Sequence, residues 1–299
     1  MKTSGYAELH RHLDGSLRPD TLRELAREQR VELPKDIRFY PGMGLSEALS
    51  RFAITLSVLQ RPRAVQRIAS EMCEDAAREG ISTLEIRFAP QLHTSAPLPA
   101  IVDAALDGIA GRAGLILCAL YGDSPELVQQ LVDVGAARPG VVGIDLAGGP
   151  APHHTVGMAD YAPAFGRARS LGLGRTVHAG EGRPPGEIRV AIEQLHAQRI
   201  GHGTTLLEDP AVLALICDRQ VTIEACPTSN VHTGVIAQVD DHPIHRWLTL
   251  GVRVCVCTDN TLLSDVDSPT EHARVRAIPG MSDAHLEQLI AFGHEAAFR

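Results

Sequence analysis

The sequence predicts a (β/α)₈ barrel, and three observations lead to that fold class. Short apolar runs typical of buried parallel strands recur along the chain, eight in all. Segments with helical periodicity separate most of these runs. Polar and ionisable residues follow directly after the runs, where the strand ends of a barrel form its active face. Because 299 residues suit one barrel, we expect a single domain over residues 1–299.

The first expected strand covers residues 6–15 and contains the pattern His10-x-His12. Residues two apart on a strand point to the same side, whereas on a helix they diverge by roughly 200°. Both imidazoles can therefore reach one metal ion. The alternative is that they are two ordinary polar residues at a strand edge. A helix is expected to begin at Pro19.

Residues 31–65 are expected to form irregular structure and short helices. They would either form a lid over the site or pack on the barrel wall, and the sequence does not separate these alternatives. A clear helical pattern follows over residues 64–79, and Gly80 is placed to end that helix.

Seven further strands are expected in a steady rhythm, with helical patterns such as residues 126–132, 187–195 and 210–216 between them. These strands cover residues 82–88, 115–120, 141–146, 176–178, 199–201, 221–226 and 252–257. A doubly wound open sheet is the alternative fold, although no Gly-x-Gly-x-x-Gly pattern opens a helix.

Charge and composition limit the partners. The net charge is -8 and the sequence has no basic run, which argues against a nucleic-acid backbone or an anionic membrane as partner. No apolar stretch is long enough to span a bilayer, and the first residues lack the layout of a signal peptide. The six cysteines are scattered, and Cys255-x-Cys257 is more typical of packing than of a thiolate metal pair. We therefore expect a reducing cytoplasm and a small-molecule partner.

Four strand-end residues have the character of ligands for one divalent metal ion: His10, His12, His178 and Asp259. Imidazole and carboxylate without thiolate suit zinc, with iron or manganese as alternatives. A catalytic metal lowers the pKa of a bound water towards neutrality. Glu181 and His202 are placed to carry protons beside that water, and glycine on both sides of His202 lets another group come close.

The motifs that contain these residues resemble the adenosine deaminase family. The likeness runs from about residue 6 to the C-terminus, and the motifs occur in the family's order and approximate spacing. The matching segments are residues 9–15 (LHRHLDG), 87–91 (RFAPQ), 145–148 (DLAG), 176–181 (TVHAGE), 199–203 (RIGHG), 226–230 (CPTSN) and 258–260 (TDN).

This resemblance implies a (β/α)₈ barrel, one zinc ion on the four ligands named above, and a role for each remaining site residue. Glu181 would donate a proton to N1 of the purine, and His202 would orient or deprotonate the attacking water. The main chain at Gly148 would contact N3, Asn260 would face N7, and Asp14 would contact the ribose hydroxyl. His12 would also face the substrate. For this chemistry we expect Glu181 to be protonated near neutral pH through a raised pKa.

The sequence departs from the family pattern at three places. Gly149-Pro150 replaces a stretch that commonly contains Glu, Asn260 stands where many members have Asp, and the chain stops at Arg299, where relatives usually continue. The leading hypothesis is a zinc-dependent deaminase of adenosine or a close 6-aminopurine nucleoside. Alternatives are deamination of a modified nucleoside such as aminodeoxyfutalosine, deamination of free adenine, hydrolysis of another amide or ester, and a non-catalytic binding barrel. The cytidine-deaminase zinc signature, Pro-Cys-x-x-Cys, does not occur.

Overall fold

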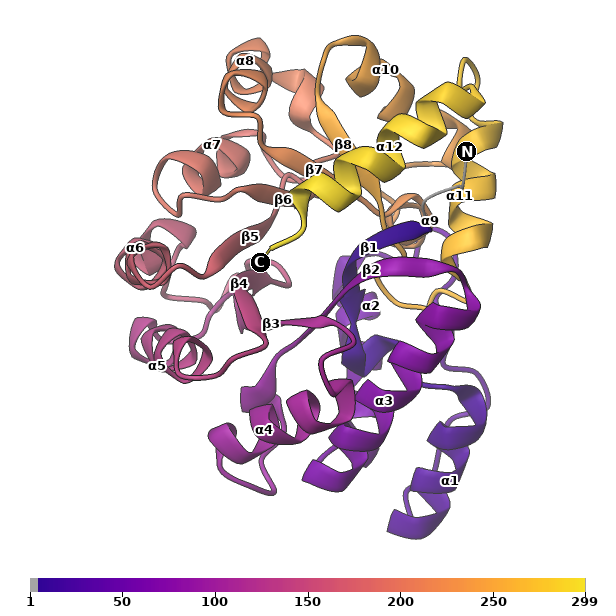
Figure 1. The fold of residues 1–299 in the computed structure, drawn as a ribbon, viewed down its shortest axis with the longest axis vertical. Coiled ribbons are helices and arrows are strands. Elements are labelled where there is room, and N and C mark those ends of the chain that lie inside the picture. Colours follow the sequence, from indigo (N-terminus) through magenta and orange to yellow (C-terminus); the bar gives the residue numbers. More distant parts are fainter. Residues whose placement is uncertain (1–4, 299) are drawn as a thin grey trace.

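A computed structural model describes residues 5–298, and its central feature is one sheet of eight parallel strands in the order β1 to β8 (Figure 1). Main-chain hydrogen bonds between the end of β1 and the residues after β8 bring the two edges together: Asp259 donates to the carbonyl of His10, and His12 donates to that of Asp259. The strands are Tyr6–His12, Ile81–Phe88, Gly114–Leu120, Val141–Ala147, Gly174–Ala179, Arg199–His202, Thr222–Ala225 and Arg253–Val256. The prediction of a (β/α)₈ barrel is confirmed, and the doubly wound alternative is wrong.

Helices surround the sheet and connect successive strands (Figure 1). Proline at the first helical position is frequent, as in α1, α3, α5 and α8, because proline's fixed φ and missing N–H suit that position. The helices, α1 to α12, are Pro19–Gln29, Leu45–Val58, Pro62–Arg78, Leu98–Ile109, Pro125–Ala136, Ala162–Ser170, Gly186–Glu193, Pro210–Arg219, Pro227–His232, Ile244–Thr249, Ser268–Ala277 and Asp283–Ala296. Gly80, which follows α3, has φ +77°, as expected for a residue that ends a helix.

The first strand is shorter than the sequence predicts. It ends at His12, and residues Leu13–Gly15 form a 3₁₀ helix (η1) in place of an extended segment. The side chain of Asp14 therefore does not follow the two-residue alternation of β1, and its position results from the turn.

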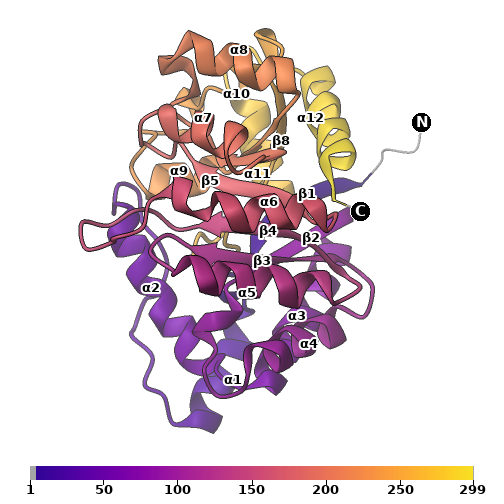
Figure 2. The ribbon, with the colours of Figure 1, turned by 90° about the vertical axis from the view of Figure 1, so that its left-hand side faces the viewer.

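The segment over residues 31–65 contains one helix of 14 residues, α2, and not only the short helices predicted. Figure 2 shows α2 at one end of the barrel, with the start of β1 and the end of α12 at the other end. Phe52 of α2 packs in a cluster with Phe39, Met43, Ala48 and Leu263, which fastens α2 to the loop after β8. The lid role of this segment and the single-domain boundary over residues 1–299 stay predictions.

The main apolar core lies between the strands and the surrounding helices, but the inside of the barrel also holds charged side chains. Arg87 on β2 pairs with Asp145 on β4 and with Glu224 on β7, at 2.9 and 2.8 Å. Arg199 on β6 pairs with Glu224 and with Glu85 on β2. Except for Arg199–Glu224, which joins the neighbouring strands β6 and β7, these buried ion pairs link strands that are not adjacent in the sheet. No helix over residues 5–298 has the length and apolar character that a membrane span requires.

Candidate active site

The six residues predicted to carry metal and protons meet at the carboxyl ends of the strands. His10 and His12 lie on β1, His178 on β5 and His202 at the end of β6, while Glu181 and Asp259 follow β5 and β8 directly. All are buried except His12, which is partly buried. His202 and Asp259 adopt left-handed backbone conformations, with φ +68° and +61°. Such strain in residues other than glycine is concentrated at functional sites, because it aims side chains that a relaxed backbone would not.

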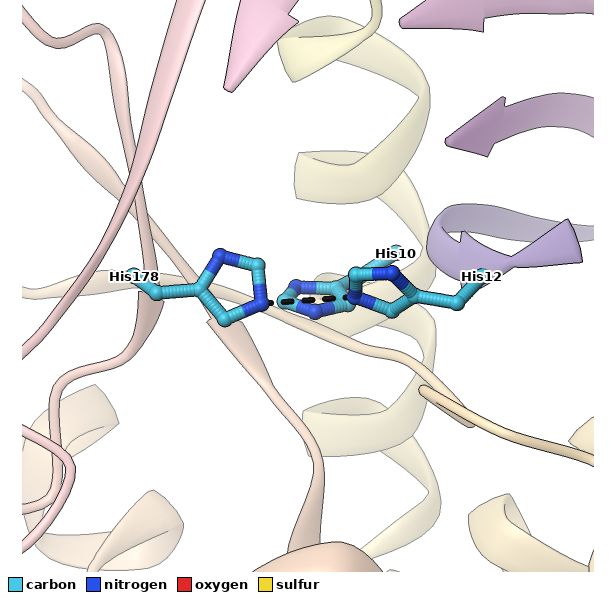
Figure 3. A group of neighbouring side chains, drawn as sticks. All are labelled: His10, His12 and His178. Atoms are coloured by element: carbon cyan, nitrogen blue, oxygen red, sulfur yellow. Dashed lines mark hydrogen bonds between the residues drawn. The ribbon is translucent and has the colours of Figure 1, made fainter. Parts of the chain in front are cut away.

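The imidazole rings of His10, His12 and His178 lie together with their nitrogens close to one another (Figure 3), and the carboxylate of Asp259 lies beside them. The Nε2 atoms of His12 and His178 are 3.3 Å apart, and Oδ1 of Asp259 lies 3.5 Å from Nε2 of His12 and 3.7 Å from Nε2 of His10. Ligand atoms held tetrahedrally by zinc at 2.0–2.1 Å would be separated by about 3.3 Å. The Nε2 atom of His10 is buried without a hydrogen-bond partner among residues 5–298. The donor set and its spacing therefore fit a tetrahedral divalent ion.

A second combination of possible ligands shares the same space, because His10, His202 and Asp259 also lie close enough together to hold an ion. The two groups overlap in His10. His202 therefore lies immediately beside the metal position, where it can act either as a further ligand or on a molecule bound to the metal.

Two carboxylates orient the imidazole rings of the candidate ligands. Glu224 lies 2.7 Å from Nδ1 of His10, and Asp145 lies 3.2 Å from Nδ1 of His178. Each leaves Nε2 of its histidine directed at the metal position, an arrangement common around protein-bound metals. Arg87 holds both carboxylates at once. Sequence reasoning did not identify the roles of Arg87 and Glu224, although a charged residue inside an apolar parallel strand is itself an unusual signal.

Burial and neighbouring charges set the protonation of these histidines. Burial and the cation of Arg87 lower the pKa of His10 well below its ordinary value, and burial and His178 do the same for His12. Both rings are therefore neutral near pH 7 and available as ligands. Burial lowers the pKa of His178 as well, but the charge and hydrogen bond of Asp145 outweigh it, so that this pKa is raised. Asp145 thus favours electron density on the His178 ring, which strengthens it as a ligand.

Glu181 accepts hydrogen bonds from two side chains of the loop that contains α9. The hydroxyl of Thr233 donates at 3.1 Å and the amide of Asn230 at 3.5 Å. The same amide nitrogen lies 3.0 Å from Nδ1 of His202, and Nδ1 of His202 is 3.9 Å from the carboxylate. An amide NH₂ only donates, so it fixes Nδ1 of a neutral His202 as acceptor and leaves the proton on Nε2. Thr233 and Asn230 thereby hold the two proton-carrying residues in fixed positions.

The raised pKa predicted for Glu181 is wrong for the substrate-free protein. Burial raises the pKa of Glu181, but the charges of His202, Arg183 and His178 and the hydroxyl of Thr233 outweigh that effect, so that the pKa lies below its ordinary value. From the sequence only the dry pocket is predicted. The structure adds the neighbouring charges, and Glu181 is ionised until something further removes water or charge from its surroundings.

Two adjacent cavities lie at the carboxyl ends of the strands. The inner cavity, about 50 Å³, is lined by the candidate metal ligands His12, His178 and Asp259, by Glu181 and His202, and by Asn260. The side cavity, about 420 Å³, is lined by Asp14 and by residues that follow β2, β3 and β4. The cavities share four lining residues: His12, Leu49, Phe52 and Gly148. The structure therefore brings the predicted site residues to two adjacent cavities, with Asp14 in the side cavity. His10 lines neither cavity, but it lies beside the other candidate ligands.

Three predicted substrate contacts are free to bind in this space. The carboxylate oxygen Oδ1 of Asp14 and the amide oxygen Oδ1 of Asn260 are buried without hydrogen-bond partners over residues 5–298. Burial also raises the pKa of Asp14 to about 7. Gly148 has φ +75°, and open space surrounds its Cα, so another molecule can approach its main chain closely. Buried polar atoms are normally paired, so unpaired ones beside a cavity are typical of ligand contacts.

A carboxylate just before a helix could instead cap that helix, but Asp14 does not do so. Arg18 is the N-cap residue of α1, and within residues 5–298 no side-chain hydrogen bond caps that helix. The cysteine alternative also falls away, because Cys255 and Cys257 pack with Leu9 and Cys226 in a small buried cluster. The thiols are free, and neither belongs to a group of potential metal ligands within residues 5–298.

A (β/α)₈ barrel with a histidine–carboxylate cluster at its strand ends defines a class, the amidohydrolase-type deaminases, which are hydrolases acting on C–N bonds of cyclic amidines. The family model described as adenosine deaminase matches residues 6–299. An adenosine deaminase of Enterococcus faecalis is 33% identical, with 97% of this chain and 91% of that protein covered. The chain belongs to the adenosine deaminase family, and it deaminates adenosine-like purines.

Other similar proteins agree on the family and differ in their named substrates. A probable adenosine deaminase of Dictyostelium discoideum is 36% identical over 89% of this chain, which spans only 37% of that longer protein. Among solved structures, an adenine deaminase of Arthrobacter aurescens has a TM-score of 0.89 at 26% identity, covering 99% of this chain and 94% of its own. An Arabidopsis N6-mAMP deaminase has a TM-score of 0.87 at 25% identity, covering 99% and 94%.

Proposed function

We propose that this chain is a zinc-dependent hydrolase that replaces the 6-amino group of adenosine, or of a closely related 6-aminopurine nucleoside, with oxygen and releases ammonia. The observation that carries the proposal is that two cavities lie side by side and share four lining residues. Three of the four candidate metal ligands and both proton-carrying residues line the inner cavity, and a carboxylate suited to a ribose hydroxyl lies in the side cavity. A free base would use only the first of these.

His10, His12, His178 and Asp259 would hold one zinc ion, with Glu224 and Asp145 fixing two of the rings. When bound, zinc would supply a Lewis acid that lowers the pKa of a water molecule towards neutrality. His202 presents the N–H of its Nε2 toward the same space, because Nδ1 accepts from Asn230. Of its two suggested roles, this arrangement favours orienting the attacking oxygen over removing its proton.

Glu181 would hold the proton that N1 of the purine receives, which makes C6 electrophilic. Its lowered pKa in the free protein means that it must gain this proton as the substrate binds. A purine ring stacked in the inner cavity would displace the remaining water and disfavour the charged carboxylate. The main-chain N–H of Gly148 would donate to N3. The NH₂ group of the Asn260 amide, not its unpaired Oδ1, would donate to N7 without needing protonation.

The inner cavity as it stands holds only a few water molecules, since each needs about 10–15 Å³. A purine therefore requires the side chains of α2 that separate the two cavities, Leu49 and Phe52, to move. This requirement supports a lid role for the segment over residues 31–65. The competing role, packing on the barrel wall, would leave the purine without room.

The proposal is tested by ammonia release from adenosine, deoxyadenosine, adenine, aminodeoxyfutalosine, N6-methyl-AMP and cytidine, with zinc-loaded protein. We expect adenosine or deoxyadenosine to be turned over with the highest kcat/KM among the unmodified compounds. Adenine and N6-methyl-AMP are included because similar structures are named for those substrates. Adenine turned over as fast as adenosine would overturn the nucleoside assignment, and no turnover of any purine would overturn the deaminase assignment.

A further inference from the structure

The side cavity, about 420 Å³, is much larger than the inner cavity, and Asp14 is one of its lining residues. Gly148, the proposed contact to N3, lines both cavities, so the N3 and N9 edge of a purine in the inner cavity would face the side cavity. A ribose attached at N9 would then enter the side cavity, where Asp14 lies. Whatever is attached at the 5′ position of the nucleoside then continues into the remaining volume, which the purine and ribose do not need.

The walls of this remaining space are apolar and come from three separate parts of the chain. Leu56 lies on α2, Leu92 follows β2, and Leu120 and Tyr121 lie at the end of β3. Five large apolar side chains stand out as exposed over residues 5–298, and two of them, Leu49 and Leu92, line this cavity. Exposed apolar side chains gathered at a cavity indicate a surface that is covered by a ligand.

The charges around the side cavity oppose an anionic ligand. Among residues 5–298 no lysine or arginine lines it, and Asp14 is its one acidic residue. Arg183 is the nearby cation: its guanidinium lies over the ring of Tyr121, 5.5 Å from the ring centre, and its Nε pairs with Glu187 at 2.8 Å. Nη1 of Arg183 has no hydrogen-bond partner over the same residues and lies near Gly149 of the cavity wall, so Arg183 is a cation that Glu187 already neutralises in part. His153 and His154 are the other ionisable side chains facing the space, together with the thiol of Cys118 and the ring of His12. A phosphate there would be buried beside the carboxylate of Asp14. The nearest cation, Arg183, is already paired with Glu187 and would only partly neutralise it.

We propose that the side cavity is a binding site for an uncharged, apolar group at the 5′ position of the nucleoside, and that it excludes 5′-phosphates. The substrate class would be 6-aminopurine nucleosides whose 5′ hydroxyl is replaced by an alkylthio or aryl-bearing group. This inference rests on the proposed function, because it uses the purine orientation given there. It adds that the enzyme's selectivity lies in the four apolar side chains Leu56, Leu92, Leu120 and Tyr121.

Equilibrium binding of reaction products tests the site without relying on turnover. Dissociation constants of zinc-loaded protein would be measured by calorimetry for inosine, 5′-deoxy-5′-methylthioinosine and inosine 5′-phosphate. We expect the methylthio compound to bind ~10-fold more tightly than inosine, since its added apolar surface is buried. The phosphate should bind at least ~100-fold more weakly than inosine. The corresponding amines, adenosine, methylthioadenosine and AMP, would be compared by kcat/KM in parallel.

Charge placed at the cavity rim should change this order. Leu92→Arg should reduce the ratio of the dissociation constants of inosine 5′-phosphate and inosine by ~10-fold. It should also weaken the binding of the methylthio compound. Leu92→Gln separates loss of apolar surface from gain of charge, and should weaken only the methylthio compound. Leu171→Arg, at a similarly exposed leucine after α6 that does not line the cavity, is the matched control and should leave all three constants unchanged.

The outcomes separate this inference from the proposed function. Phosphate binding equal to inosine binding, or methylthio binding ~10-fold weaker than inosine binding, would overturn the inference even if adenosine is deaminated. Absence of ammonia release from adenosine and methylthioadenosine would overturn the proposed function, whatever the binding order. The predicted binding order together with a matching order of kcat/KM would support both.

Discussion

At the amino-terminal end of the barrel, Arg199 is buried between Glu85 and Glu224, and the ring of Phe298 covers its guanidinium at 3.6 Å. At the carboxyl-terminal end, His10, Asp14 and Asn260 each bury a polar atom that has no partner among residues 5–298. Both ends hold ionisable groups in a low-dielectric interior. At the amino-terminal end Nε of Arg199 also lacks a hydrogen bond, but it lies 2.7 Å from the carboxylate of Glu224 in an ion pair. Oδ1 of Asp14 and Oδ1 of Asn260 have no such partner, and both residues line a cavity. We infer that buried polar atoms without any partner beside a cavity, more than buried charge as such, identify the functional end.

The largest effect is expected from loss of the metal. Protein purified without chelator should contain one zinc ion per chain by elemental analysis. His178→Ala should lose the metal and all measurable deaminase activity, because a ligand that Asp145 orients is removed. Metal-free protein with full activity would contradict the mechanism.

The next effect concerns the proton carriers of the functional end. Glu181→Gln should retain zinc and the fold but lose at least ~10²-fold in kcat, because an amide can bond to N1 without delivering a proton. His202→Ala should lose a similar factor, since the attacking oxygen would lose its orientation. Elemental analysis and circular dichroism serve as controls. Retained activity in Glu181→Gln would mean that another group is the acid.

Two glutamates that pair with the same arginine allow a matched comparison of the two ends. Glu224→Gln should weaken zinc affinity ~10–100-fold, because Glu224 orients the ring of His10. Glu85→Gln removes the other carboxylate from Arg199 at the amino-terminal end and should leave zinc affinity unchanged. Competition with a zinc chelator measures both. Equal losses would show that Glu224 acts through the shared ion-pair network and not through His10.

A smaller effect is expected at Asp14. Wild-type protein should prefer adenosine over adenine by at least ~10-fold in kcat/KM, because an unpaired buried acceptor costs about 1–3 kcal/mol. Asp14→Ala should lower the rate with adenosine and leave that with adenine, so the preference shrinks. Two rates that fall together would mean that Asp14 supports the turn at Leu13–Gly15 and does not read the ribose.

The smallest effect on activity is expected at the amino-terminal end of the barrel. Phe298→Ala should leave kcat with adenosine unchanged, since Phe298 lies at the opposite end of the barrel from the inner cavity. Its ring packs on Arg199 and against Gly174, so its loss should lower the free energy of unfolding by about 1–3 kcal/mol. Thermal denaturation of the zinc-loaded protein measures this loss. A fall in kcat without a fall in stability would contradict the division between the two ends.

The sequence was sufficient for the barrel because strand rhythm and polar strand ends are local patterns, and each expected strand is present with its ends shifted by a few residues. The sequence also identified all the candidate site residues. That identification depended on the resemblance to the family as much as on local patterns. The sequence could not predict how Arg87 joins Asp145 to Glu224, because that contact joins strands far apart in the sequence. The turn at Asp14 and the lowered pKa of Glu181 were mispredicted for the same reason. Both depend on neighbours that only the closed barrel supplies.

The left-handed backbone of His202 and Asp259 has a consequence for protein engineering. Glycine at either position would relax the chain, and by the usual rules for thermostabilisation these are attractive substitutions. Each such gain would remove a side chain that the proposed chemistry cannot lose. A screen for thermostability alone would therefore select substitutions that inactivate the enzyme. Screens of its variant libraries need to measure turnover together with melting temperature.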